Sequence, residues 1–204
     1  MNWFKHFFSP KTRSKVDQDF FQANDAYLLG EKLWKESILS DESVEFRDNK
    51  KIEALKLFDK AIELGFEEEA EIYSMRGSIL NDLGFYFDAL DDYNKAILNR
   101  PKKGIADNYF LRGFIKESIY DYEGAIADVE EAIRLSKLDN DDNKYWDQHY
   151  QKIHFQSAAD YYDWVLSTIK RSRYLKEQLN ELSPKDIQLK LQMIKRRERN
   201  TAEL

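Results

Sequence analysis

The stretch RGSILNDLGFYFDALDDYNKAILNRP, residues 76–101, contains the pattern that decides the fold. Its apolar residues recur at the spacing of an amphipathic helix on both sides of Gly84. Glycine allows the chain to turn between two helices, and Pro101 stops the second helix. Three residues are small, as two antiparallel helices require where they approach closely: Gly77, Ala89 and Ala96. The stretch therefore predicts a pair of antiparallel helices.

The same pattern returns 36 residues later in the chain. The matching pairs are Tyr73 and Tyr109, Arg76 and Arg112, Gly77 and Gly113, Ala89 and Ala125, Asp92 and Asp128, and Ala96 and Ala132. Upstream, the second half recurs as Ala54, Phe58 and Ala61. Gly30 and Leu33 can supply the first half there, with extra residues at about 38–50 between the helices. Self-similarity at such a period indicates a stacked array of helix pairs.

This pattern resembles the tetratricopeptide repeat, a helix pair of 34 residues. Counted from residue 70, the small residues and Pro101 fall at positions 8, 20, 27 and 32, which match the family. The next copy keeps the small residues but has Lys116, Val129 and Lys137 where the family has a large residue, an aromatic residue and a proline. The resemblance covers about residues 25–137. It implies an all-α fold, a right-handed superhelix of antiparallel helix pairs with a helical C-terminal cap.

Four segments follow from this reading. Residues 1–24 form an aromatic and basic N-terminal segment and the start of the first helix. Residues 25–137 hold three repeats, at about 25–64, 70–103 and 106–137. Residues 138–182 are capping helices or a degenerate fourth pair. Residues 183–204 form a basic helix, with Ser183 as N-cap, Pro184 in the first turn and one apolar stripe of Ile187, Leu191 and Ile194.

Composition excludes several classes of protein. The chain of 204 residues is 42% hydrophobic and 34% charged and has no Cys. These values indicate a soluble globular protein without disulfides, thiolate catalysis or a Cys-based zinc site. The net charge is −6, and basic residues are concentrated at both ends. An acidic body does not favour nucleic acid as the main partner. No apolar run is long enough to span a membrane, and we expect a cytoplasmic location.

Arg76 with Asp92 and Arg112 with Asp128 are the sharpest polar feature of the repeats. They could form a ligand clamp or ion pairs between the two helices of each repeat. Their recurrence at equivalent positions favours the second interpretation, because a site is normally unique. We therefore predict two structural ion pairs.

Other candidate sites lack a required element. Residues 139–150 begin like a calcium loop but have Lys144 where the loop needs glycine and Tyr150 where it needs glutamate. The histidines lack a third ligand and a positioned carboxylate, and no phosphate loop or nucleophile motif is present. We predict no metal, no cofactor and no enzymatic activity. The aromatic N-terminus is expected to pack on the body rather than on a membrane, and the basic run at 194–199 to be a solvated helix end.

The resemblance implies a protein–protein interaction module, a scaffold or adaptor whose first helices line a concave groove that binds a peptide or protein segment. The groove residues on this reading are Tyr27, Glu31, Trp34, Ser74, Ser78, Asp107, Phe110, Phe114 and Glu117. Members that bind chaperones hold a terminal carboxylate with Lys and Asn at positions that here carry neither. The expected partner is therefore apolar or basic rather than an acidic C-terminus. The alternative is a regulatory adaptor that contacts nucleic acid or an anionic membrane through the basic termini.

Overall fold

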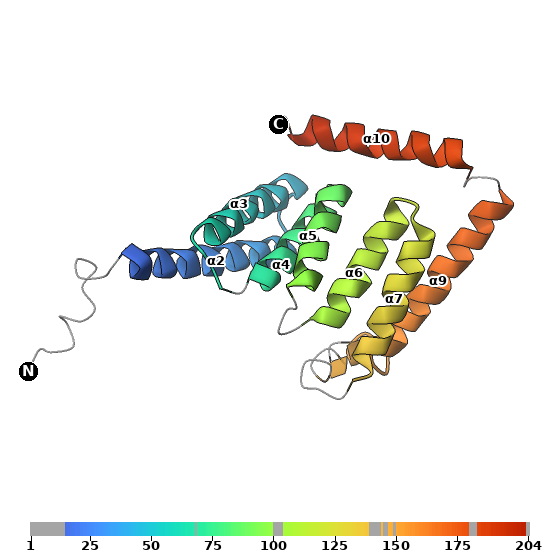
Figure 1. The fold of residues 1–204 in the computed structure, drawn as a ribbon, viewed down its shortest axis with the longest axis horizontal. Coiled ribbons are helices and arrows are strands. Elements are labelled where there is room, and N and C mark those ends of the chain that lie inside the picture. The colour runs from blue at the N-terminus through green and yellow to red at the C-terminus, as the bar shows by residue number, and fades with distance from the viewer. Residues whose placement is uncertain are drawn as a thin grey trace, which may run out of the picture.

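The computed structural model describes residues 15–67, 69–99, 104–138, 144, 147–148, 150–179 and 183–202. Helices are the only regular elements in these residues (Figure 1). They are α2 (Lys15–Leu39), α3 (Val44–Glu63), α4 (Glu69–Asp82), α5 (Tyr86–Leu98), α6 (Ile105–Ser118), α7 (Tyr122–Ser136), α9 (Ala158–Gln178) and α10 (Pro184–Ala202). The predicted N-terminal segment before residue 15, Pro101 and most of the calcium-like loop lie outside the described residues.

The helices stack as antiparallel pairs in chain order, α2 with α3, α4 with α5 and α6 with α7. The first helix of each pair packs on the second helix of the preceding pair. α9 packs on α7 in the same way, and α10 crosses the ends of the pairs (Figure 1). The predicted all-α architecture of stacked helix pairs with a C-terminal helical cap is thus confirmed. We call the three pairs and α9 the stack.

In each pair, a side chain of the second helix packs directly against a glycine of the first helix. A methyl group at Gly77 would lie 2.9 Å from the Tyr93 ring, and one at Gly30 would lie 2.9 Å from the Phe58 ring. At Gly113 it would lie 2.9 Å from a methyl of Val129 and 3.0 Å from a backbone carbonyl oxygen. These distances are shorter than ordinary van der Waals contact, so only glycine permits this separation of the helices. The repeat read from the sequence is therefore a repeat of one packing contact.

The extra residues of the first pair lengthen its helices rather than forming a long loop. α2 continues to Leu39, and α3 already begins at Val44. The start of α3 is fixed by Ser43, whose hydroxyl accepts a hydrogen bond from the Phe46 amide at 3.2 Å. A serine at this position satisfies an amide that the helix itself leaves open.

α9 covers the last pair as a single long helix. Ser157 caps its start by accepting a hydrogen bond from the Asp160 amide at 3.1 Å. Tyr162, Val165, Leu166 and Ile169 are buried against the core of α6 and α7. A terminal helix must cover its neighbour's apolar face, and α9 does so.

Candidate protein-binding face

The first helices of the pairs adjoin one another, α2 next to α4 and α4 next to α6, and ring contacts continue the row to α9. We call the side chains that these helices contribute along the row the first-helix face. It includes the nine residues predicted to line a groove. The structure divides them into side chains that pack inside the stack and side chains that remain open to solvent.

At the α2 end, the aromatic residues belong mainly to the packing. Tyr27 is half-buried and stacks on Phe66, with ring centroids 4.4 Å apart and planes 22° apart. Trp34 is half-buried against the core of the first pair. Glu31 forms an ion pair with Lys35 at 2.8 Å on the surface of the same helix. This end therefore offers charge and partly covered rings.

In the middle of the row, the two serines of α4 are engaged with protein atoms. The Ser74 hydroxyl donates to the Ala70 carbonyl oxygen at 2.9 Å. The hydroxyls of Ser78 and Tyr93 lie 2.8 Å apart and form a hydrogen bond. Burial raises the pKa of Tyr93 above the ordinary tyrosine value. Small polar groups thus lie between the rings at the α2 end of the face and the rings at its α6 end.

At the α6 end, Phe110 is buried by α9. It is 6% exposed and stacks on Tyr162 with ring centroids 4.5 Å apart, and a second ring from α9, Tyr161, lies 5.5 Å away. The Tyr162 hydroxyl donates to Asp107 at 3.3 Å. Phe110 therefore holds the cap to the last pair, and Asp107 lies at the edge of this contact.

Phe114, one turn further along α6, remains 45% exposed. α9 adds Trp164, which is 57% exposed and lies over Tyr161 with ring centroids 6.1 Å apart. Phe155 is 5.9 Å from Trp164 and completes a cluster of aromatic rings. We call Phe114, Phe155, Tyr161 and Trp164 the aromatic end of the face.

The sequence reading missed the α9 members of the aromatic end. It assigned residues 138–182 only to capping helices or a degenerate fourth pair, without bounds for a helix. The segment SAAD at 157–160 contains the missed signal, since Ser followed three residues later by an acidic residue is a helix start. Reading that start would have placed Tyr161 and Trp164 in the first turns of α9.

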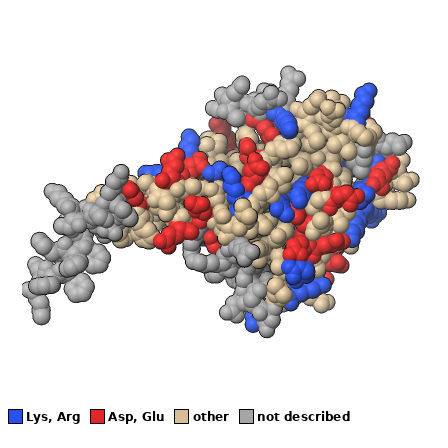
Figure 2. Space-filling model, viewed as in Figure 1, with Lys and Arg blue, Asp and Glu red and all other residues tan. Residues whose placement is uncertain are grey.

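The α6 part of the face carries two carboxyl groups, Asp107 and Glu117. Burial raises the pKa of Tyr161, Tyr162 and Tyr150, and the nearby Asp107 carboxylate raises it further. Burial also raises the pKa of Glu117, although Lys176 and a hydrogen bond with Ser172 oppose this. Figure 2 shows Asp and Glu side chains spread over one side of the molecule, with Lys and Arg between them.

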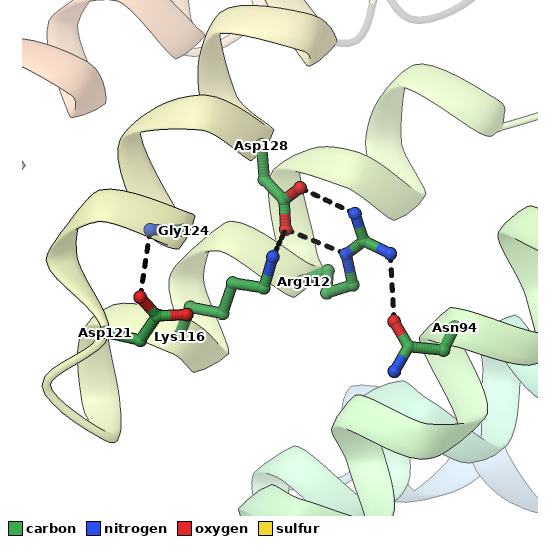
Figure 3. A network of polar contacts seen from close by, with 6 residues as sticks. All are labelled: Asn94, Arg112, Lys116, Asp121, Gly124 and Asp128. Atoms are coloured by element: carbon green, nitrogen blue, oxygen red, sulfur yellow. Dashed lines mark hydrogen bonds and ion pairs between the residues drawn. The ribbon is translucent and has the colours of Figure 1, made fainter.

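Both predicted Arg–Asp ion pairs are present, and each arginine also reaches the preceding pair. Arg112 donates through Nε and Nη2 to Asp128 at 2.8 and 2.6 Å, and through Nη1 to Asn94 of α5 at 2.9 Å (Figure 3). Lys116 adds a contact of 2.8 Å to Asp128.

Arg76 repeats this arrangement one pair earlier. It donates through Nε to Asp92 at 3.0 Å and through Nη1 to Asp59 of α3. In α7, the position equivalent to Asp59 and Asn94 is Glu130, which accepts a hydrogen bond from Lys170 of α9 at 3.0 Å. A cation therefore links each pair to the helix that follows it.

The described residues contain no group of three or more His, Asp or Glu side chains placed to hold a metal ion. None of the described helices combines the length and the apolar character needed to cross a membrane.

The stacked antiparallel helix pairs agree with the resemblance to the tetratricopeptide repeat seen in the sequence. No family model matches the chain, and no curated protein matches it. Among solved structures, the chain is similar to the TPR domain of OM64 from Arabidopsis. The two are 23% identical, with a TM-score of 0.42, and the match covers 62% of this chain and 98% of that one.

Proposed function

We propose that this protein is a non-enzymatic interaction module that binds a protein segment on its first-helix face. The observation that carries the proposal is the aromatic end, where Trp164 is half exposed and stacks over the half-buried Tyr161, and Phe114 is half exposed one turn from the buried Phe110. Rigid aromatic side chains that keep large exposed areas are typical anchors of protein interfaces.

The charge around these rings favours a partner with apolar and basic residues. Asp107 of α6 accepts a hydrogen bond from Tyr162, and Asp160 and Asp163 are exposed on α9 in the turns that carry Tyr161 and Trp164. Carboxylates at these positions repel an acidic segment and attract Lys or Arg. The segment expected to bind therefore carries an apolar or aromatic residue for the ring cluster and a basic residue beside it.

The experiment compares peptide binding by the full chain and by three variants. Phe114→Ala and Trp164→Ala each truncate one exposed ring, and Leu98→Ala is the matched control, since Leu98 is an exposed apolar residue at the end of α5. We expect apolar and basic peptides to bind, and each aromatic variant to weaken binding by about tenfold or more. Leu98→Ala should bind as the unchanged protein does.

Two outcomes would reject the proposal. One is selective binding of acidic C-terminal peptides that survives in both aromatic variants. The other is binding of RNA or DNA with a steep dependence on salt, unchanged in both variants, which would favour an adaptor acting through its basic termini.

A further inference from the structure

The second helices of the first and third pairs are capped by the side chain of the residue before them, whereas the second helix of the second pair is not. Ser43 caps α3, and Asp121 caps α7 by accepting a hydrogen bond from the Gly124 amide at 2.9 Å (Figure 3). The equivalent residue before α5 is Phe85, which makes no side-chain cap hydrogen bond. The amino end of α5 therefore lacks the cap that its neighbours carry.

Glu198 of α10 supplies this missing acceptor from 111 residues further along the chain. Its Oε1 accepts a hydrogen bond from the Phe87 amide at 3.3 Å, in the first turn of α5. Lys195, one turn earlier in α10, places its ammonium 4.7 Å from the centre of the Phe87 ring. A carboxylate at this position also faces the positive end of the helix dipole.

A second contact fixes α10 at the α6–α7 turn. Tyr120 has a φ of 68°, in the left-handed region, where the preceding pair has Gly84 with a φ of 84°. Glycine adopts this conformation readily, whereas a tyrosine is disfavoured there. The Tyr120 ring lies 4.8 Å from the Lys190 ammonium of α10 and 4.8 Å from that of Lys176 of α9. The strained residue thus provides the ring on which α10 rests.

The exposure of α10 agrees with docking along one face. The apolar stripe of Ile187, Leu191 and Ile194 is half-buried, together with Lys190 and Glu198. Leu189 and Met193, on the opposite side, are exposed. Figure 1 shows α10 lying across the ends of the pairs, so its inner face meets the turns rather than the first-helix face.

We propose that the α4–α5 and α6–α7 turns form a helix-binding surface, separate from the first-helix face, and that α10 is its built-in occupant. Selectivity comes from the amino end of α5, which has no side-chain cap of its own. It binds a carboxylate on a helix that carries a lysine one turn earlier. Because α10 reaches both turns, it ties the second pair to the third.

The Glu198 side chain can be tested as an acceptor separately from its charge. Burial and the neighbouring Asp88 raise the pKa of Glu198, while hydrogen bonds from the Phe87 and Tyr86 amides lower it. Glutamine keeps an acceptor oxygen at this position, and alanine removes it. Alanine also favours the helix, so any loosening of α10 in Glu198→Ala does not come from a weaker helix.

The test is amide hydrogen exchange in the full chain, read at Phe87 and along α10. In Glu198→Ala we expect exchange to become about fivefold faster at both places, as loss of a helix cap implies. Glu198→Gln should have a smaller effect. The matched control is Met193→Ala, which truncates an exposed residue on the outer side of α10 and should leave exchange unchanged.

A second pair of variants separates capping from general packing. Phe85→Asp gives α5 the residue that α7 has, and Phe85→Ser serves if the aspartate variant does not fold. In Phe85→Asp/Glu198→Ala, the aspartate should accept from the Asp88 amide, three residues on as Gly124 is from Asp121, so protection of the first turn of α5 should return while α10 stays loosened. The proposal is overturned if Glu198→Ala leaves both places unchanged, if it loosens α10 without affecting Phe87, or if the local cap fails to restore the first turn of α5.

Discussion

Replacing Asp128 with alanine should be among the most destabilising single changes in the stack. The Asp128 side chain is 6% exposed and accepts contacts from Arg112 and Lys116, whose side chains are 16% and 18% exposed. Its removal leaves two nearly buried cations without their carboxylate. Breaking a buried pair in this way costs about 3–5 kcal/mol.

The equivalent change in the preceding pair should cost less. Asp92 accepts one hydrogen bond from Arg76, and Arg76 keeps its second partner, Asp59, when Asp92 is removed. We expect a loss of about 2 kcal/mol for Asp92→Ala. The difference between the two variants follows from the burial of the second cation: Lys95, 3.7 Å from Asp92, is 53% exposed, whereas Lys116, 2.8 Å from Asp128, is 18% exposed.

Urea unfolding followed by circular dichroism measures both free energies of unfolding at neutral pH. The control is Glu131→Ala, which removes a surface ion pair with Arg134 and should change the free energy of unfolding very little. A value for Asp128→Ala equal to that of the control would refute the reasoning. Unchanged stability with lost peptide binding would instead make the pair a ligand clamp.

Three further outcomes are expected. Burial raises the pKa of Asp92 despite the opposing charge of Arg76, so the folded state binds this proton more tightly than the unfolded state does. Wild type should therefore gain stability relative to Asp92→Asn as the pH falls from 7 toward the ordinary aspartate value of 3.8, as urea unfolding at several pH values would show. Gly113→Ala should lower the free energy of unfolding by about 1 kcal/mol, because overpacking outweighs the gain in helix propensity, and thermal melting can check this. Phe110→Ala should cost about 3–5 kcal/mol in urea unfolding because the ring is buried under α9.

The stacked helix pairs could be predicted because one packing contact recurs along the chain. Gly77 and Gly113 lie 16 residues before Tyr93 and Val129, which meet them in the structure. The first pair shows the same contact between Gly30 and Phe58 across a longer connection. Small residues at fixed spacing are visible in a sequence, so the repeat and its helices could be read there.

The exposed residues of the first-helix face and the position of α10 were harder to predict from the sequence. Phe110 and Phe114 are one helical turn apart and both apolar, and only the position of α9 decides that one is buried and the other exposed. The docking of α10 depends on Phe85 failing to cap α5 and on Glu198 reaching it, two residues far apart in the chain. Local patterns carry no information about such a contact.

The arginines that bridge successive pairs have a consequence for how the protein opens. In a repeat protein, stability is the sum of the terms within units and the terms between neighbours, and strong neighbour terms make units open together. Arg76 joins α3 to α5 through α4, and Arg112 joins α5 to α7 through α6. Opening the second pair therefore breaks charged contacts on both of its sides. The middle of the chain should consequently unfold as one cooperative block, with fraying at the outer turns of α2 and in α10.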